Sequence, residues 1–327
     1  MRTMKAAILE APGKFVVTER PMPDIGTDEI LVRTEVCGVC TSEVDMFEGK
    51  NKALVYPRFI GHEVSGVVEN VGSRVKDLRP GDRVAVYSEG GGYAEFTRVP
   101  AKWAVKLADE TRFEHALGEP IACSVNGVRK ADPELNDRIA LVGCGFMGLI
   151  MLQVFKARGA GLLIAIDRRR SALELAERLG ATHTILADDN ETVIDEVKSL
   201  SEGKGVDIGI EAAGIQSTLD LTSKIVRMEG KLEVFGFHQG GLREVDWAYW
   251  NWMAFQIVNG HTRTQDVYVD GMRIGIGMIE NGLLDMKPLV THTYSLEDIN
   301  KGFEDASAKS EGFVKGVISF ENGTESR

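Results

Sequence analysis

The stretch RIALVGCGFMGLIMLQVFKAR, residues 138–158, decides the fold of this chain. We interpret residues 138–143 as a strand and residues 146–158 as an amphipathic helix. Between them, Gly143-Cys144-Gly145-Phe146-Met147-Gly148 fits the pattern G-x-G-x-x-G. The first glycine permits a tight turn, the second lets backbone approach a pyrophosphate, and the third lets the helix pack on its strand. The stretch therefore predicts a dinucleotide site, although a bare match also fits a glycine-rich turn without a ligand.

An acidic residue at the end of the next expected strand favours NAD. Asp167 lies 19 residues after Gly148, where an acid binds the ribose hydroxyls of NAD and repels the extra phosphate of NADP. Three arginines follow it and belong either to a solvated helix start or to a grip on a 2′-phosphate. We expect NAD rather than NADP, because the acid is the more diagnostic residue. The expected cofactor-binding residues are Gly143, Gly145, Phe146, Met147, Gly148, Asp167 and Arg168.

The pattern of strands and helices changes along the chain. The first third consists of short strand-like runs broken by turn signals, which indicates an antiparallel, partly barrel-like domain. From about residue 120, strands alternate with helices, which indicates a parallel sheet. The expected strands are 5–9, 15–18, 29–36, 63–71, 83–87, 138–143, 162–167, 182–186, 206–211, 231–235 and 316–320, and the expected helices are 146–158, 171–179, 192–200, 218–226, 271–280 and 296–308.

Composition limits the class of protein. The 327 residues are enough for one or two domains, and 43% hydrophobic with 27% charged residues excludes disorder as the main state. A net charge of −11 disfavours nucleic acid and anionic membranes as partners. No secretory signal and no apolar run of about 20 residues is visible. Four cysteines cannot build a disulfide framework, so we expect a cytoplasmic protein.

Two short motifs indicate a metal site. Cys37-Gly38-Val39-Cys40 follows an expected strand, and Gly61-His62-Glu63 begins another. A C-x-x-C motif alone fits either a redox pair or half of a structural zinc site. No second C-x-x-C exists, and Cys123 and Cys144 lie far along the chain. A thiolate, an imidazole and a carboxylate form a suitable three-ligand set for a catalytic zinc with one open position.

The order of these motifs resembles the zinc-dependent medium-chain dehydrogenase family, in its sorbitol-, threonine- and glucose-dehydrogenase-like branch. The segment Gly61-His62-Glu63-x2-Gly66-x5-Gly72-x2-Val75 is similar to the family's zinc signature. The resemblance continues through Pro80-Gly81-Asp82-Arg83-Val84, Gly92-Tyr93-Ala94-Glu95, Glu119-Pro120, the glycine loop and Val206-Asp207…Ala213-Gly214. It implies an α/β fold: a GroES-like β-rich catalytic domain at 1–121 and 263–327, with a doubly wound Rossmann domain inserted at 122–262.

The resemblance also implies roles for the motif residues. Cys40 would be the thiolate ligand and His62 the imidazole ligand, while Cys37 would be a strand residue. Glu63 would bind zinc directly or stand close to it. Glu119 would bind zinc or hold a water on it. The lobe of four cysteines that binds structural zinc in many relatives is missing, so one catalytic zinc per chain is expected.

Proton transfer would begin at Ser42, on the loop that follows Cys40. The family's relay usually continues through a histidine three residues later, and here that position holds Asp45. Asp45 or water completes the relay, or the route differs. A solvated loop carboxylate is an equally good interpretation of Asp45. The expected catalytic residues are therefore Ser42, Asp45 and Glu63.

Together these features predict hydride transfer from a polar secondary alcohol (a polyol, sugar or amino alcohol) to NAD, giving the ketone. The site would lie between the two domains, in a homodimer or homotetramer paired through residues 255–261. The aromatic cluster at 247–252 could line the pocket, but packing at the domain junction or a subunit interface is the favoured interpretation. The rivals are a zinc-free enone or quinone reductase, which would lack Cys40 and His62, and a catalytically silent NAD-binding protein.

Overall fold

The computed structural model describes residues 2–50 and 52–320 and divides into two compact units. Unit 1 comprises Met1–Ala122, Thr264–Glu280 and Met286–Arg327, and unit 2 comprises Cys123–Arg263 and Asn281–Asp285. The helix α2 (Gly118–Ala131) runs from the first unit into the second. Unit 2 is therefore an insertion into the chain of unit 1.

Unit 2 contains a parallel sheet with the order β10-β9-β8-β11-β12-β13. All five strand pairs are parallel. The strand order reverses beside β8, which is the doubly wound arrangement of dinucleotide-binding domains. The predicted parallel sheet is thus confirmed. The strands are β8 (Arg138–Val142), β9 (Leu162–Asp167), β10 (His183–Leu186), β11 (Val206–Glu211), β12 (Val226–Val234) and β13 (Gln256–Asn259).

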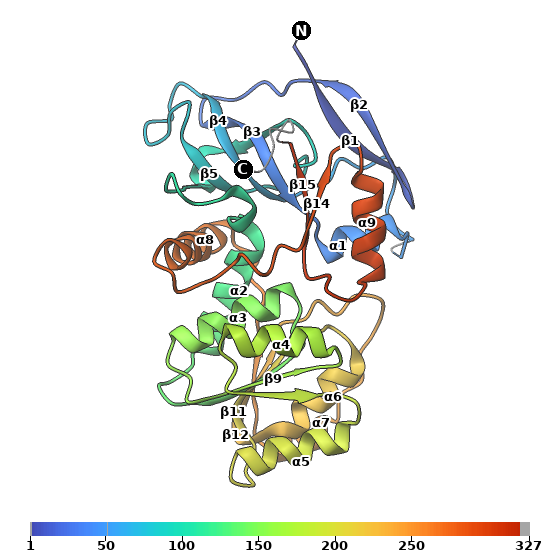
Figure 1. The fold of residues 1–327 in the computed structure, drawn as a ribbon, viewed down its shortest axis with the longest axis vertical. Helices are drawn as coiled ribbons and strands as arrows, with labels where there is room; N and C mark the ends of the chain where they lie inside the picture. The colour runs from blue at the N-terminus through green and yellow to red at the C-terminus, as the bar shows by residue number, and fades with distance from the viewer. Residues whose placement is uncertain (1, 51, 321–327) are drawn as a thin grey trace. The chain divides into compact units, whose positions relative to one another are not determined.

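Helices cover both faces of this sheet (Figure 1). The helix α3 packs against α4, and α5 packs against α6, because right-handed crossovers on either side of the order reversal place the two pairs on opposite faces. In α4 the buried residues recur on one face, as the apolar spacing of the sequence predicts. The helices are α3 (Phe146–Ala157), α4 (Arg170–Leu179), α5 (Asn190–Leu200), α6 (Gln216–Ile225) and α7 (Trp247–Trp252).

Unit 1 is built on a seven-stranded sheet with the order β14-β15-β3-β4-β5-β7, with β6 also paired to β3. It is antiparallel apart from the parallel pair β14–β15. A separate hairpin joins β1 (Thr3–Ala11) and β2 (Lys14–Pro21). The sheet strands are β3 (Glu29–Gly38), β4 (Glu63–Val71), β5 (Arg83–Tyr87), β6 (Phe96–Pro100), β7 (Ala104–Lys106), β14 (His292–Ser295) and β15 (Gly316–Ser319).

An aromatic cluster anchors the helix α1 (Thr41–Phe47) to the core of unit 1. The ring of Phe47 lies 5.8 Å from that of Phe15 and 5.4 Å from that of Phe303, centroid to centroid. Phe303 belongs to α9 (Ile299–Ala308), which lies beside α1 in Figure 1. The ring of Tyr93 lies edge-on to Phe303 at 5.6 Å. This packing fixes the helix that follows Cys40.

Several elements differ from the sequence expectations. Residues 41–47 were expected as a loop but form α1, because Val44 and Phe47 are buried on one helical face. The helix α8 (Gln265–Glu280) begins six residues earlier than expected. In α7, Trp250 is buried in the core of unit 2, whereas Trp247 and Trp252 are 61% and 76% exposed.

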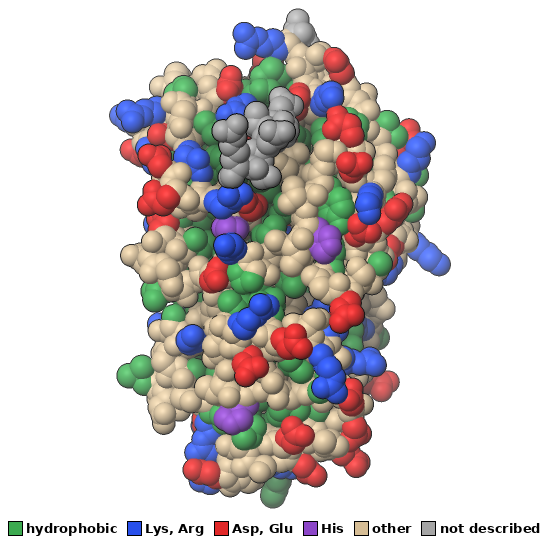
Figure 2. Space-filling view, viewed as in Figure 1, with side chains coloured by type: hydrophobic (Ala, Val, Ile, Leu, Met, Phe, Trp, Pro, Cys, Tyr) green, Lys and Arg blue, Asp and Glu red, His purple; other side chains and the backbone are tan. Residues whose placement is uncertain are grey.

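The surface carries mixed charge. Figure 2 shows acidic and basic side chains interspersed on the viewed face rather than collected into one basic area. Within residues 2–50 and 52–320, no helix combines the length and apolar character needed to cross a membrane.

A carboxyl group is buried in unit 2 without a hydrogen-bond partner among the residues described. Glu233 on β12 is fully buried, and neither of its carboxyl oxygens has a hydrogen-bond partner among the residues described. Burial raises the pKa of Glu233 well above its ordinary value, and the charge of Lys130 offsets this only in part. The folded chain therefore retains a proton that the unfolded chain loses above about pH 4.3.

We predict that Glu233→Gln stabilises the protein increasingly as pH rises from about pH 4 to about pH 8. A raised carboxyl pKa contributes a stability that is present at low pH and is lost as pH rises through the folded pKa, and glutamine removes this loss. Urea denaturation at several pH values measures the effect. Glu229→Gln, an exposed carboxylate on the same strand, serves as the control. A pH-independent difference between Glu233→Gln and the wild type would contradict the prediction.

Candidate active site

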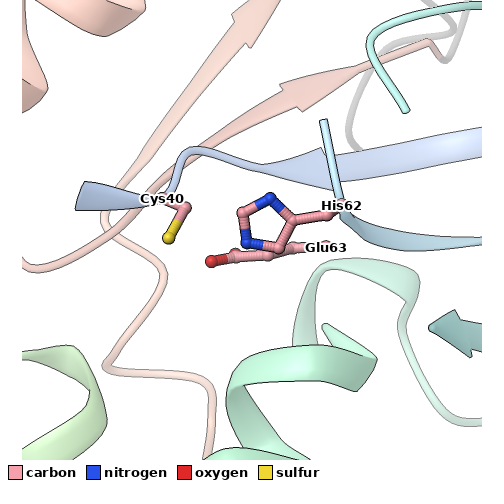
Figure 3. A group of neighbouring side chains, drawn as sticks. All are labelled: Cys40, His62 and Glu63. Carbon is pink, nitrogen blue, oxygen red and sulfur yellow. The ribbon is translucent and has the colours of Figure 1, made fainter. Parts of the chain in front are cut away.

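Three potential metal ligands meet at one end of the sheet of unit 1 (Figure 3). Cys40 is the N-cap residue of α1, just after β3, and Glu63 is the first residue of β4, directly after His62. One ligand atom from each residue lies within 4.8 Å of the other two. Because β3 pairs antiparallel with β4, the two sequence motifs meet where the strands adjoin.

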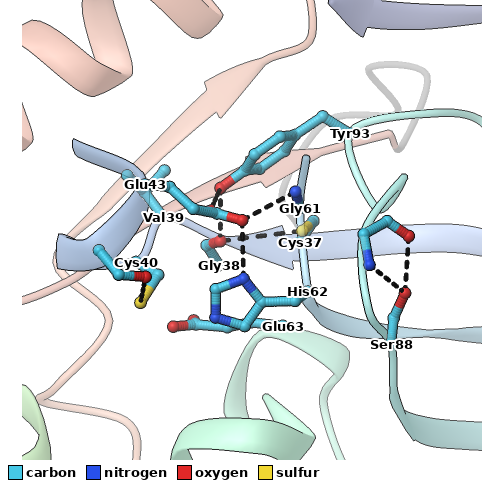
Figure 4. A network of polar contacts seen from close by, with 12 residues as sticks. Cys37, Gly38, Val39, Cys40, Glu43, Gly61, His62, Glu63, Ser88 and Tyr93 are labelled. Atoms are coloured by element: carbon cyan, nitrogen blue, oxygen red, sulfur yellow. Dashed lines mark hydrogen bonds and ion pairs between the residues drawn. The ribbon is translucent and has the colours of Figure 1, made fainter. Parts of the chain in front are cut away.

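Glu43 on α1 holds His62 in place (Figure 4). Its Oε1 accepts hydrogen bonds from His62 Nδ1 at 2.7 Å and from the backbone N–H of Gly61 at 2.8 Å. Its Oε2 accepts one from the hydroxyl of Tyr93 at 2.5 Å. With Nδ1 bound to a carboxylate, the ring presents Nε2 toward Cys40 and Glu63, which is the usual arrangement of a metal-ligating histidine.

The electrostatics of the cluster favour a cation. Burial alone would raise the pKa of Glu43, but the charge of His62 and hydrogen bonds from its neighbours lower it, so this carboxylate is ionised. Burial alone would lower the pKa of His62, yet the charges of Glu43 and Cys40 raise it well above its ordinary value. The same negative potential that favours a proton on this imidazole favours a metal ion beside it.

Lys315 provides the countercharge of Glu63. Its Nζ donates a hydrogen bond to Glu63 Oε1 at 2.8 Å and lies 2.6 Å from Oε2 as an ion pair. It also donates to the backbone oxygen of Val39 at 2.8 Å. Oε2 of Glu63 is buried and accepts no hydrogen bond from any residue described, so the ion pair with Lys315 is its recorded polar contact. A side chain on Gly38 would collide with this oxygen, since its Cβ would lie 2.0 Å away.

The expected relay residues lie on α1 rather than on a loop. Ser42 is half-buried, with its Oγ 3.2 Å from the sulfur of Cys40. Asp45 follows three residues later on the same helical side and pairs with Lys50 at 2.8 Å. Asp45 is half-buried, and it lies on a helix rather than on the expected loop.

Glu119 lies outside the group of three. It is a half-buried residue in the first turn of α2. The start of this helix is close to the cluster, because Leu117 Cδ1 would lie 3.0 Å from a Cβ on Gly38. Cys37 is fully buried on β3, as the sequence predicts for a strand residue.

The glycine loop of unit 2 makes a tight turn at the start of α3. Gly143 has a φ of +108°, and a Cβ on Gly148 would lie 2.1 Å from the backbone oxygen of Gly143. A Cβ on Gly145 would meet no described heavy atom within 4 Å, which leaves open space at the N-terminus of α3. Phe146 is buried and Met147 half-buried in the first turn of that helix.

A cavity of about 360 Å³ lies at the carboxyl ends of β12 and β13, where ligands of doubly wound sheets bind. His238 on its wall is held by Glu211, which accepts a hydrogen bond from Nε2 at 2.8 Å. The lining residues are Val234, Gly236, Phe237, His238, Asn259, His261 and Arg263.

Three residues that the sequence analysis left without a role contribute to the site of unit 1: Glu43, Tyr93 and Lys315. Glu43 had a local signal, since it is an acid three residues after Cys40. Lys315 had none, because 252 residues separate it from Glu63. At the end of β9, Arg169 contacts Asp167, whereas the predicted Arg168 is exposed.

Fold and site together define a dinucleotide-binding dehydrogenase with a metal centre. Residues 26–109 match the family model described as alcohol dehydrogenase GroES-like domain, and residues 147–264 match the model described as zinc-binding dehydrogenase. The chain belongs to the zinc-type medium-chain dehydrogenase family, whose members include alcohol and polyol dehydrogenases.

Relatives match over nearly the full chain. The uncharacterized zinc-type alcohol dehydrogenase-like protein YdjJ of Escherichia coli K12 is 29% identical and covers 95% of this chain and 97% of its own. Sorbitol dehydrogenase of Bacillus subtilis is 28% identical, with 93% and 94% covered. A structure of rspB from E. coli CFT073, described as a short chain alcohol dehydrogenase complexed with NADH, has a TM-score of 0.87 at 25% identity, with 97% and 99% covered.

We predict that Lys315→Met destabilises the protein by about 3 kcal/mol, because it leaves the carboxylate of Glu63 buried without its countercharge. Urea denaturation in the presence of a zinc chelator measures the loss without any contribution from a bound metal. The matched control is Lys301→Met, which breaks an exposed pair with Asp305 and should cost less than about 1 kcal/mol. Equal losses of unfolding free energy in the two variants would contradict the prediction, because the buried ion pair would then stabilise the protein no more than the exposed one.

Proposed function

We propose that this protein is a zinc-dependent dehydrogenase that transfers hydride from a polar secondary alcohol to NAD, giving the ketone. The observation that carries the proposal is the meeting of Cys40, His62 and Glu63 within 4.8 Å. A thiolate, an imidazole and a carboxylate suit zinc, and the anchoring of His62 by Glu43 is the support that such a ligand needs.

The donors present fit one catalytic zinc. Cys40, His62 and Glu63 would hold it, each with one ligand atom, and Glu119 would bind it directly or through water. When bound, zinc supplies Lewis acidity that lowers the pKa of a substrate hydroxyl. We expect no structural zinc, because a closed site of that kind needs four ligands such as clustered cysteines.

The remaining roles follow from contacts of the chain itself. Ser42, whose Oγ is 3.2 Å from the Cys40 sulfur, accepts the proton of the substrate hydroxyl. Asp45, one helical turn further, passes it toward solvent beside Lys50. Lys315 balances the charge of Glu63. Hydride transfer to the nicotinamide is the chemistry of the cofactor, which the protein positions.

NAD is the cofactor that we propose. Its pyrophosphate would lie against the open face of Gly145, and its adenosine ribose near Asp167. The cavity at the ends of β12 and β13 would receive the nicotinamide. The structure of rspB, which is similar in fold, is described as complexed with NADH.

A polyol, sugar or amino alcohol is the proposed class of substrate. Carboxylates at Glu63, Glu119 and Asp45 give the site polar partners for several hydroxyl or amino groups. A relative of similar sequence is named sorbitol dehydrogenase. A zinc-free reductase would not need the Cys40–His62 pair, and a silent NAD-binding protein would not need Ser42 beside it.

We further propose that the chain works in the cytoplasm as a homodimer or homotetramer. No disulfide joins cysteines within the described residues, which is typical of a reducing compartment. The strand β13, within the predicted pairing segment 255–261, is the edge of its sheet, and Ile257 on it is 45% exposed. An exposed edge of this kind can pair with a second copy.

The zinc-loaded protein should reduce NAD⁺ with a polar secondary alcohol from a panel of polyols, sugars, amino alcohols and simple alcohols. Ser42→Ala should keep its zinc but lose about 100-fold or more in kcat, because a positioned proton acceptor contributes at least that factor. Thr41→Ala, an exposed neighbour on the same helix, should retain activity.

Two cysteine variants test whether Cys40 binds the metal. Cys40→Ala should lose both zinc and activity, and Cys37→Ala should keep both, as measured by mass spectrometric metal analysis and NADH absorbance. Activity that survives in Cys40→Ala would contradict the zinc chemistry. Bound zinc and bound NAD⁺ without turnover on any alcohol would favour the silent protein.

Association through β13 is tested by Ile257→Lys, which places a charge on the edge strand. Sedimentation velocity should record a smaller species than the wild type. Leu135→Lys, which changes an 83% exposed leucine away from this strand, is the control. A wild type that sediments as a monomer would contradict the proposal.

A further inference from the structure

The carboxylate of Asp167 is fully engaged within the chain. Its Oδ1 accepts hydrogen bonds from the backbone N–H of Arg169 at 2.9 Å and from Arg169 Nε at 3.1 Å. Its Oδ2 accepts them from the backbone N–H of Cys144 at 2.8 Å and from Arg169 Nη2 at 3.2 Å. An ionised carboxylate offers about four lone-pair sites. The two hydroxyls of a ribose can therefore bind Asp167 only if a present donor leaves.

The donor that can leave is the guanidinium of Arg169. The two backbone N–H groups belong to the glycine loop and to the start of α4, whereas the Arg169 side chain is 40% exposed and can change its rotamer. Its Nη2 also reaches the backbone oxygen of Cys144 at 3.4 Å. The guanidinium thus covers the acid and bridges it to the loop that would hold the pyrophosphate.

Arg169 also has unused donor capacity. Its Nη1 makes no hydrogen bond to any residue in the described part of the chain, which leaves two N–H groups in a planar fork suited to phosphate. Burial raises the pKa of Asp167, but hydrogen bonds and the charge of Arg169 lower it below its ordinary value, so Asp167 is ionised. The positive charge of Arg169 offsets the negative charge of Asp167. The repulsion of a 2′-phosphate that an acid normally provides is reduced accordingly.

We infer that Arg169 determines cofactor specificity and that this chain accepts NADP as well as NAD. NADP binds without a movement of Arg169, because its 2′-phosphate accepts hydrogen bonds from Arg169 Nη1. NAD binds with its ribose hydroxyls on Asp167 after Arg169 has moved away. The inference rests on the proposed function only in assuming that a dinucleotide binds at residues 143–148. Of the three arginines that follow Asp167, it assigns the contact with a 2′-phosphate to Arg169 alone.

Isothermal titration calorimetry with NAD⁺ and NADP⁺, without any alcohol, tests this. The wild type should bind both with dissociation constants within about tenfold of each other. Arg169→Ala should weaken NADP⁺ by about tenfold or more, because a charge-assisted hydrogen bond is lost. The same variant should bind NAD⁺ equally well or better. Arg178→Ala, an exposed arginine near the far end of α4, removes the same charge and should leave the ratio of the two constants unchanged.

Three results would overturn the inference: a wild type that excludes NADP⁺, a ratio unchanged in Arg169→Ala, or an equal change in Arg168→Ala. The outcomes also separate the two proposals. Failure of both dinucleotides to bind would overturn the cofactor part of the proposed function and this inference together. Tight binding of both without oxidation of any alcohol would overturn only the proposed chemistry.

Discussion

The hydrogen bond between the Glu43 carboxylate and His62 Nδ1 is the interaction on which the site depends. Glu43 is buried on α1, His62 precedes β4, and the third partner of the carboxylate, Tyr93, comes from a further loop. One carboxylate therefore fixes three segments of unit 1 relative to one another. The same hydrogen bond also sets which imidazole nitrogen faces Cys40. The aromatic cluster that packs α1 therefore also orients a metal ligand, because α1 carries Glu43.

Charge balance connects this anchor to the rest of the centre. Glu43 and Glu63 bring negative charge into a buried space beside Cys40, and such groups persist there only with partners. Lys315, the residue just before β15, neutralises part of this negative charge. A divalent cation would neutralise more. A comparable balance occurs at Asp167, where Arg169 offsets the acid beside the glycine loop. In both places a basic side chain alters what the acidic residue can bind: Lys315 from 252 residues away and Arg169 from two residues away.

Local patterns explain what could be predicted from the sequence. The glycine loop and strands 63–71, 162–167 and 206–211 follow from short-range periodicity and turn chemistry, and the structure has these strands at the same bounds. The helix α1 was missed because its seven residues owe their helical state to tertiary burial of Phe47. The Glu63–Lys315 pair was missed because it joins positions 252 residues apart. The roles of Ser42, Asp45, Glu63 and Glu119 in catalysis stay predictions.

X-ray absorption spectroscopy at the zinc edge of the zinc-loaded wild-type protein tests the central claim, a single-thiolate zinc centre built around the Glu43-anchored His62. The account predicts one sulfur ligand at about 2.3 Å, from Cys40, with nitrogen and oxygen ligands at about 2.0–2.2 Å. Two or more sulfur ligands, or none, would contradict it.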